Sequence, residues 1–319
     1  MAERPSRNLG LDLVRITEAG ALAAARWMGL GSPDGADQAA TRAVAETLES
    51  MGIPGCSVVG GEGKGRHVLL LCDRSSGGDE PLDVIADPID GVSLLAYGYP
   101  GAISVIAAAP AGHFRPLAEA AYMEKIVVNA GVAPSLVPEC LDAPAAWTLA
   151  LVARMLDKPV GALTVFVLDR PRNADLMREV RATGAHVVLR AEGDVTGALL
   201  AASRESAIDL LMGIGGVKEG LISSCAVKAL GGAMLGRLAP QSERELDAIQ
   251  AAGLDMTEVM TKENLVEGEK VFFAATGITD GPMLAGVRFR GSRATSESMI
   301  LRGETHTRRM IQAEHLLRR

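Results

Sequence analysis

Strand-like and helix-like segments alternate between residues 163 and 230, and this alternation limits the possible folds more than any other feature of the chain. Short apolar runs read as buried strands, and the segments after them carry apolar side chains at helical spacing. The expected strands are 163–168, 186–189 and 208–212, and each is followed by an expected helix: 173–183, 196–203 and 221–230. Such an order predicts an α/β fold with a parallel sheet covered by helices, and ligands gather at the carboxyl ends of its strands.

Three loops fall at those predicted carboxyl ends: 170–173, 192–194 and 213–220. The last is rich in glycine and precedes a helix, so its backbone N–H groups offer an anion site, and Glu219 offers a metal ligand. Arg170 and Arg172 flank Pro171 and could clamp a phosphate group. Without the neighbouring loops, the favoured interpretation of both arginines is that of solvated surface residues.

The stretch Asp87-Pro88-Ile89-Asp90 follows a strand-like segment, 82–86. Pro88 fixes its own φ and disfavours helix at Asp87, so the turn is stiff. Two carboxylates and the Ile89 carbonyl facing one point would suit Mg²⁺ or Mn²⁺. The alternative is a capped turn, in which Asp90 accepts hydrogen bonds from a helix that opens at Val92.

The rest of the N-terminal part predicts two helices, 11–29 and 38–50, and strands at 68–72, 102–109 and 126–128. Asp37 is then either the N-cap of the second helix or a metal ligand. Glu62 lies in the glycine-dense stretch 60–65, which implies close approach of the backbone to another group.

A helix at 145–156 and a change of pattern near residue 158 divide the chain into domains 1–158 and 159–319. The C-terminal part predicts polar helices within 241–260 and a basic helix at the tail, 305–319. Strands are expected at 271–275, 283–290 and 296–302.

Composition excludes several classes of protein. The chain has 319 residues, 48% of them hydrophobic, and a net charge of −7 without a basic block, which argues against nucleic-acid binding. No apolar run is long enough for a membrane span, and the N-terminus lacks a signal-peptide pattern. The four cysteines are scattered, which favours a reducing compartment, and we expect a cytoplasmic protein.

The loops together resemble the class II fructose-1,6-bisphosphatases, within the wider magnesium-dependent, lithium-sensitive sugar and inositol phosphatase fold. The resemblance covers nearly the whole chain, and its motifs occur in one order. They are Arg15-Ile16-Thr17-Glu18 with Trp27, Ala36-Asp37, Gly61-Glu62-Gly63, Asp87-Pro88-Ile89-Asp90-Gly91, Tyr122-Met123-Glu124-Lys125, Pro171-Arg172, Gly193-Asp194-Val195, Gly213-Ile214-Gly215-Gly216 with Glu219-Gly220, Ala275-Thr276-Gly277-Ile278-Thr279, Leu301-Arg302-Gly303 and Arg308-Arg309.

This resemblance implies a layered α-β-α-β-α sandwich, a homo-oligomer (dimer or tetramer), a phosphorylated sugar substrate and a Mg²⁺ or Mn²⁺ cofactor. It also favours the ligand interpretation of Asp37 over the N-cap. The implied metal ligands are Asp37, Glu62, Asp87, the Ile89 carbonyl, Asp90 and Glu219, of which Glu62, Asp87 and Asp90 also act in catalysis. The implied substrate contacts are Gly91, Tyr122, Arg170, Arg172, Asp194 and Glu219.

The chain departs from the family pattern where water is activated. Val92 stands where the family has a threonine that helps to orient the attacking water, and Gly31-Ser32-Pro33 replaces a Gly-Asp-Lys loop. The first hypothesis is a metal-dependent sugar-phosphate phosphatase. The alternatives are a divergent relative with another activity on a phosphorylated sugar, and a non-catalytic binding protein.

Overall fold

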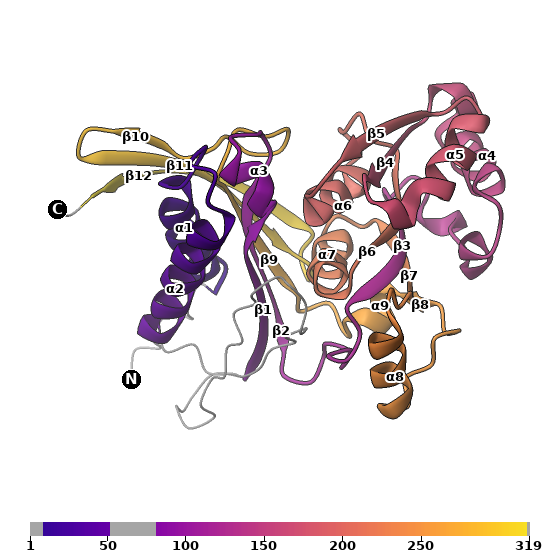
Figure 1. Ribbon diagram of the computed structural model, residues 1–319, viewed down its shortest axis with the longest axis horizontal. Helices are drawn as coiled ribbons and strands as arrows, with labels where there is room; N and C mark the ends of the chain where they lie inside the picture. The colour runs from indigo at the N-terminus through magenta and orange to yellow at the C-terminus, as the bar shows by residue number, and fades with distance from the viewer. Residues whose placement is uncertain (1–8, 52–80, 318–319) are drawn as a thin grey trace.

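The computed structural model describes residues 9–51 and 81–317. Figure 1 shows the layers in order: the pair α1 and α2, a first sheet, the pair α6 and α7, a second sheet, and the pair α4 and α5. The predicted α/β class and the layered α-β-α-β-α sandwich are therefore confirmed.

The first layer consists of α1 (Leu9–Ala25) and α2 (Pro33–Met51), which pack together and cover one face of the first sheet. Small residues make this close packing possible, because a Cβ at Gly20 would lie 2.8 Å from a methyl carbon of Val44. Since α2 begins at Pro33, Asp37 lies inside the helix and not at its N-cap. The N-cap interpretation of Asp37 is wrong, and the proline at the first helical position explains the earlier start.

The first sheet is antiparallel throughout, in the order β1-β2-β9-β11-β10, with β12 paired to β11. Its strands are β1 (Leu82–Asp90), β2 (Ile103–Pro110), β9 (Phe272–Gly277), β10 (Arg288–Arg290), β11 (Arg293–Arg302) and β12 (Thr307–Leu316). The predicted C-terminal helix is wrong: the tail forms β12, which pairs with β11 along its whole length. The predicted strand 283–290 is likewise reduced to β10.

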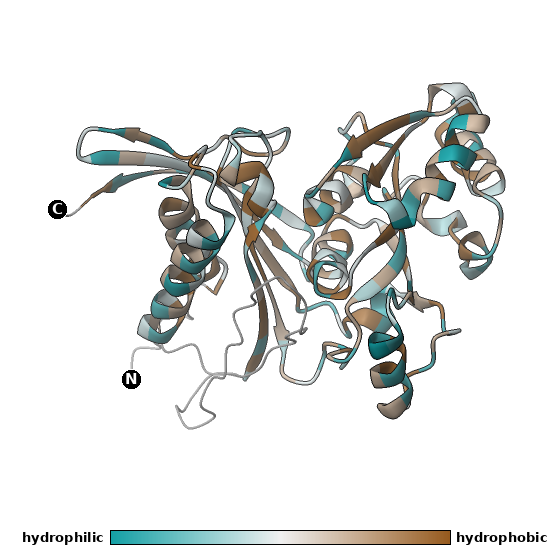
Figure 2. Ribbon diagram, in the orientation of Figure 1, coloured by the Kyte–Doolittle hydropathy of each residue, from teal (hydrophilic) through white to brown (hydrophobic). Residues whose placement is uncertain are grey.

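The central layer is formed by α6 (Asp194–Ala202) and α7 (Val217–Ala229), which are buried almost all round. Both contribute to the largest apolar cluster, together with strands from the two sheets. Figure 2 shows the contrast with the surface: hydrophobic colour dominates β1 and β9, whereas the outlying helix α8 (Glu243–Ala251) is largely hydrophilic.

The second sheet has the order β5-β4-β6-β3-β7-β8. Its strands are β3 (Tyr122–Val128), β4 (Thr164–Leu168), β5 (His186–Arg190), β6 (Leu210–Gly216), β7 (Ala233–Leu238) and β8 (Met260–Thr261). The expected parallel arrangement is confirmed for β4 with β5 and β6. It is wrong for the other half, where β3 runs antiparallel to β6 and β7.

The outer face of this sheet is covered by α4 (Ala145–Leu156) and α5 (Ala174–Ala182), whose apolar side chains join strand residues in a separate cluster. Short helices α3 (Val92–Ala96) and α9 (Lys262–Leu265) complete the described elements together with four 3₁₀ turns: Ala133–Ser135, Pro138–Leu141, Val160–Ala162 and Pro171–Asn173.

The chain leaves the first sheet after β2 and returns to it with β9. Consequently β3, which precedes residue 158, pairs in the second sheet, while β9 to β12 pair in the first. The division into domains 1–158 and 159–319 stays a prediction. Among the helices described, none combines the length and apolar character needed to cross a membrane.

Candidate active site

The predicted ligand loops meet at one edge of the second sheet. The parallel strands β4, β5 and β6 end there, and antiparallel β3 begins there, with Tyr122 paired to Gly216. The expected loop 213–220 is absent, because Gly213 to Gly216 belong to β6 and α7 starts directly at Val217. Glu219 therefore lies in the first turn of a 13-residue helix.

The Asp87-Pro88-Ile89-Asp90 turn forms the end of β1, where the pairing with β2 shifts register between Asp87 and Asp90. Gly91 then adopts a left-handed conformation (φ 99°, ψ 48°), which residues with a side chain rarely adopt, and α3 opens at Val92. The predicted helix start is confirmed. The N-cap residue of α3 is Gly91, so the helix has no side-chain cap. The Asp90 carboxylate instead accepts a hydrogen bond at 3.2 Å from the backbone N–H of Thr196 in α6.

A second acid makes the reverse connection from the β5–α6 loop to α3. Glu192 accepts hydrogen bonds from the backbone N–H and the hydroxyl of Ser93, each at 2.8 Å. Arg170 lies 3.5 Å from the same carboxylate. The Ser93 hydroxyl is thus engaged by Glu192, and Arg170 is an ion-pair partner of Glu192 at this edge.

Lys218 links Asp87 to Glu219. Its Nζ lies 3.1 Å from Oδ2 of Asp87 and 3.5 Å from Oε1 of Glu219. The side chain of Lys218 is only 9% exposed. Burial alone would lower the pKa of Lys218, but the charges of Asp87 and Glu219 outweigh it, and the pKa is raised.

Asp90 carries the clearest electrostatic signature of the site. Burial raises its pKa well above the ordinary value, and the charges of Asp87, Asp194 and Glu219 raise it further, while the hydrogen bond from Thr196 acts in the opposite direction. Negative charge is therefore in excess around Asp90.

Asp194, predicted to contact substrate, is held by the protein. Its Oδ2 accepts a hydrogen bond from Nζ of the buried Lys125 and another from the backbone N–H of Gly216 at 3.1 Å. Lys125 Nζ also donates to the Gly216 carbonyl at 3.1 Å. This arrangement compensates both buried charges and fixes the end of β6.

The glycines at the end of β6 make room for these carboxylates. A Cβ at Gly215 would lie 2.0 Å from Oδ2 of Asp194, and one at Gly216 would lie 1.7 Å from Oε2 of Glu219. The dense glycine pattern of this segment thus reflects close approach of two acidic side chains.

Arg172 and Tyr122 lie together at the same edge. The Arg172 guanidinium carbon is 4.6 Å from the centroid of the Tyr122 ring, a cation–π contact, and Nε donates to the Ile214 carbonyl at 3.0 Å. Both predicted substrate contacts therefore lie at the edge where β3 begins and β6 ends.

Three more residues were predicted to belong to the site: Glu62, Asp37 and Val92. Glu62 lies outside the described residues, so its role stays a prediction. Asp37 is half-buried in α2, which packs against α3. Val92 is half-buried and packs against an apolar cluster that contains the buried side chain of Ile89. The valine side chain has no group that could orient water.

Lys125, Lys218 and Glu192 were not assigned roles from the sequence. Lys125 ends the Tyr122-Met123-Glu124-Lys125 motif, and Lys218 directly precedes Glu219 in the glycine-rich segment. The predicted strand 126–128 and helix 221–230 left both lysines outside, whereas Lys125 lies in β3 and Lys218 in the first turn of α7. Correct bounds would have been the signal, since a buried lysine needs a carboxylate partner.

A family model described as "Bacterial fructose-1,6-bisphosphatase, glpX-encoded" matches residues 7–315. The chain belongs to this family. It is 36% identical to the class 2 fructose-1,6-bisphosphatase of Haemophilus influenzae, over 98% of this chain and 97% of that protein. It is 34% identical to fructose-1,6-bisphosphatase 1 class 2 of Escherichia coli K12, over 98% of this chain and 96% of that protein.

The family resemblance implies a divalent cation. Within residues 9–51 and 81–317, no group of three or more His, Cys, Asp or Glu side chains is arranged to hold a metal ion. The oxygen donors of Asp87, Asp90 and Glu219, with the negative charge in excess around Asp90, nevertheless fit a hard cation by their chemistry. The complete ligand set, with Asp37 and Glu62, stays a prediction.

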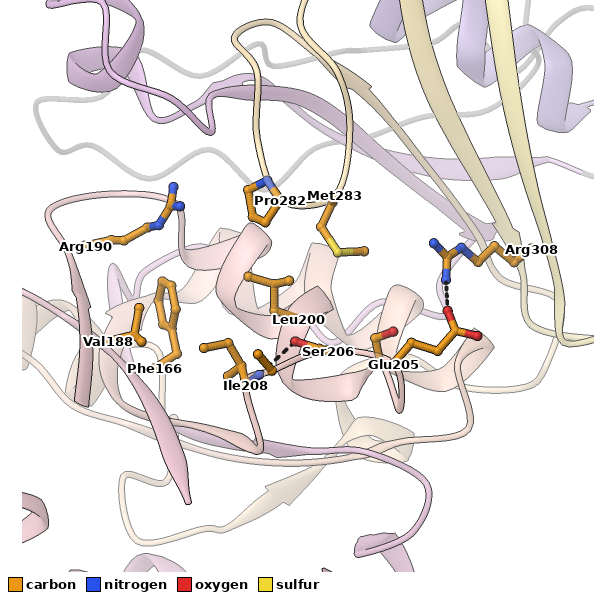
Figure 3. Close-up of a pocket in the computed structure, with 12 residues that line it drawn as sticks. Phe166, Val188, Arg190, Leu200, Glu205, Ser206, Ile208, Pro282, Met283 and Arg308 are labelled. Carbon is orange, nitrogen blue, oxygen red and sulfur yellow. Dashed lines mark hydrogen bonds and ion pairs between the residues drawn. The ribbon is translucent and has the colours of Figure 1, made fainter. Parts of the chain in front are cut away.

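A separate pocket of about 390 Å³ lies between β4, β5 and the C-terminal end of α6 on one side and the loop that carries Pro282 and Met283 on the other (Figure 3). Its floor is mostly apolar, and Arg190 and Arg308 flank it. None of the predicted site residues lines it, so the pocket is distinct from the candidate active site.

Proposed function

We propose that this chain hydrolyses a phosphate monoester of a sugar bisphosphate, with fructose 1,6-bisphosphate as the substrate. The names of the relatives from Haemophilus influenzae and Escherichia coli support this substrate. The comparisons lend no support to a divergent activity on another phosphorylated sugar. They lend no support to a non-catalytic role either, since both relatives are named as phosphatases.

The observation that carries the proposal is the connection of Asp87 to Glu219 through Lys218. Asp87 lies near the end of β1 in the first sheet, while Glu219 lies in the first turn of α7 in the central layer. A buried carboxylate, Asp87, and a partly exposed one, Glu219, are thus held together from distant segments, which is unfavourable unless cationic groups lie between them.

Residues that would hold the cofactor, Mg²⁺ or Mn²⁺, are Asp87, Asp90, the Ile89 carbonyl and Glu219, with Asp37 and Glu62 from the family pattern. When bound, the divalent ions lower the pKa of a water molecule and stabilise charge on the phosphoryl oxygens.

The chain's own residues bind and orient the substrate. Arg172 is oriented by its hydrogen bond to Ile214 and by the Tyr122 ring, and it would pair with a phosphate group. The N-terminus of α7 presents backbone N–H groups, which favour an anion. Thr196 holds the Asp90 carboxylate in a fixed orientation.

A phosphate-release screen tests the proposal. The purified chain is offered a panel of sugar monophosphates and bisphosphates, each with Mg²⁺, Mn²⁺ or chelator. Release from fructose 1,6-bisphosphate that requires either metal supports the proposal. Release that chelator leaves unchanged contradicts metal dependence, and silence on every sugar phosphate contradicts the activity.

Two further parts of the proposal concern the protein in the cell. We place it in the cytoplasm, because its four cysteines are scattered without metal or redox pairing motifs. Assembly into a homo-oligomer, a dimer or a tetramer, rests on the family resemblance alone.

A further inference from the structure

The ammonium group of Lys218 lies between two carboxylates to which the family pattern assigns metal binding. Nζ is 3.1 Å from Oδ2 of Asp87 and 3.5 Å from Oε1 of Glu219, and the lysine side chain is 9% exposed. Asp90, on the same turn as Asp87, also feels the charge of this ammonium group. Lys218 is therefore part of the acidic cluster and not a surface residue beside it.

The position is an unfavourable one for a lysine unless the acids compensate it. Lys218 lies in the first turn of α7, where the helix dipole favours negative charge and opposes a cation. Of the thirteen residues of α7, only Glu219 is not buried, so the lysine has little solvent to offset this opposition. The carboxylates of Asp87 and Glu219 stabilise the ammonium group in this position.

We propose that Lys218 is a built-in cation: its ammonium group takes the place of one divalent ion between Asp87 and Glu219. The site consequently holds fewer divalent ions per chain than it would with a neutral residue at position 218. This inference rests on the proposed metal-dependent function and adds to it that one positive charge belongs to the protein.

The electrostatic consequence is a direct competition. An ammonium group hydrogen-bonded to Asp87 and ion-paired with Glu219 occupies their oxygens and repels a divalent ion nearby. A neutral side chain at position 218 removes this repulsion and leaves the two carboxylates without this cation. We therefore expect the Lys218→Met chain to bind one more Mn²⁺, or to bind the same number at least about tenfold more tightly.

The experiment counts ions without substrate. The full chain is stripped with chelator and titrated with Mn²⁺, and free Mn²⁺ is followed by its electron paramagnetic resonance signal. Lys218→Met removes the charge and keeps the length of the side chain, whereas Lys218→Arg keeps the charge. Lys158→Met is the matched control, because Lys158 pairs with Asp209 at 2.6 Å next to the start of β6, and β6 reaches the candidate site only at its other end.

The proposal predicts a gain in Mn²⁺ for Lys218→Met alone, with Lys218→Arg and Lys158→Met equal to wild type. If Lys218→Met fails to fold by circular dichroism, Lys218→Gln takes its place. Equal Mn²⁺ number and affinity in wild type and the neutral variant would overturn the proposal, and metal-dependent phosphate release would then still support the proposed function. Absence of Mn²⁺ binding in both forms would overturn the two together.

Discussion

Asp90 and Thr196 are 106 positions apart in the sequence, and the Thr196 backbone N–H donates a hydrogen bond of 3.2 Å to the Asp90 carboxylate. Glu192, in the loop before α6, accepts hydrogen bonds from the backbone N–H and the hydroxyl of Ser93 in α3. Asp90 thus accepts a hydrogen bond from a backbone N–H at the start of α6, and Glu192 accepts one from a backbone N–H at the start of α3. This exchange fixes the Asp87-Pro88-Ile89-Asp90 turn against α6 and gives its carboxylates a defined direction.

The Glu192 connection predicts a stability effect. Glu192→Ala removes the acceptor for two groups of Ser93, so we expect the free energy of unfolding to fall by about 1–3 kcal/mol in urea denaturation. Glu205→Ala is the control, since Glu205 is 85% exposed and its pairing with Arg308 at 3.5 Å is a weak surface contact. Equal losses in the two variants would show that the exchange contributes nothing specific.

The buried pair of Lys125 and Asp194 predicts strong coupling. Asp194→Asn leaves the Lys125 ammonium, 2% exposed, without its counter-charge, and we expect a loss of about 3–5 kcal/mol. Combining Asp194→Asn with Lys125→Met removes that uncompensated charge, so the double variant is expected to lose less than the two single losses added. Additive losses in a double-mutant cycle would contradict the pairing.

A side chain at position 216 is expected to lower activity without unfolding the chain. A Cβ there would meet the flexible end of Glu219, which can move away, so the chain folds but the carboxylate is displaced. We expect Gly216→Ala to lower kcat/KM for phosphate release about 10²-fold. Gly161→Ala is the control, because its Cβ would meet nothing closer than a carbonyl oxygen at 3.7 Å. Wild-type kcat/KM in Gly216→Ala would refute the role given to this glycine.

A hydroxyl group at position 92 is expected to raise kcat. The family resemblance puts a water-orienting threonine at this position, and the neighbouring Ser93 hydroxyl is engaged by Glu192. Val92→Thr is expected to raise kcat by about 10²-fold, within the range of general-base positioning. Val92→Ala, which adds no hydroxyl, should give no gain. An unchanged kcat in Val92→Thr would mean that another group orients the water.

Local patterns predicted most elements and the site edge. The alternation of strands and helices placed Arg170, Glu192 and Glu219 at one edge, because parallel strands end together. What those patterns missed were pairings between distant segments. The tail reads as a basic helix by itself, but β11 offers it a complete set of backbone partners, and it forms β12.

The same reason explains the site residues that were missed. Lys218 and Lys125 appear in the sequence as ordinary charged residues, and only the fold brings Asp87 and Asp194 to them. The N-cap alternative for Asp37 is wrong for a local reason, because α2 begins at Pro33. For the two lysines, long-range partners decided what local spacing left open.

The central claim is that acids from distant segments form one cation-binding site for phosphate hydrolysis. The most direct measurement is the rate of phosphate release from fructose 1,6-bisphosphate, with saturating Mn²⁺, by wild type and by Asp87→Asn. Loss of this carboxylate is expected to lower kcat by at least about 10²-fold, with an unchanged circular dichroism spectrum. A folded Asp87→Asn chain that releases phosphate at the wild-type rate would contradict the account.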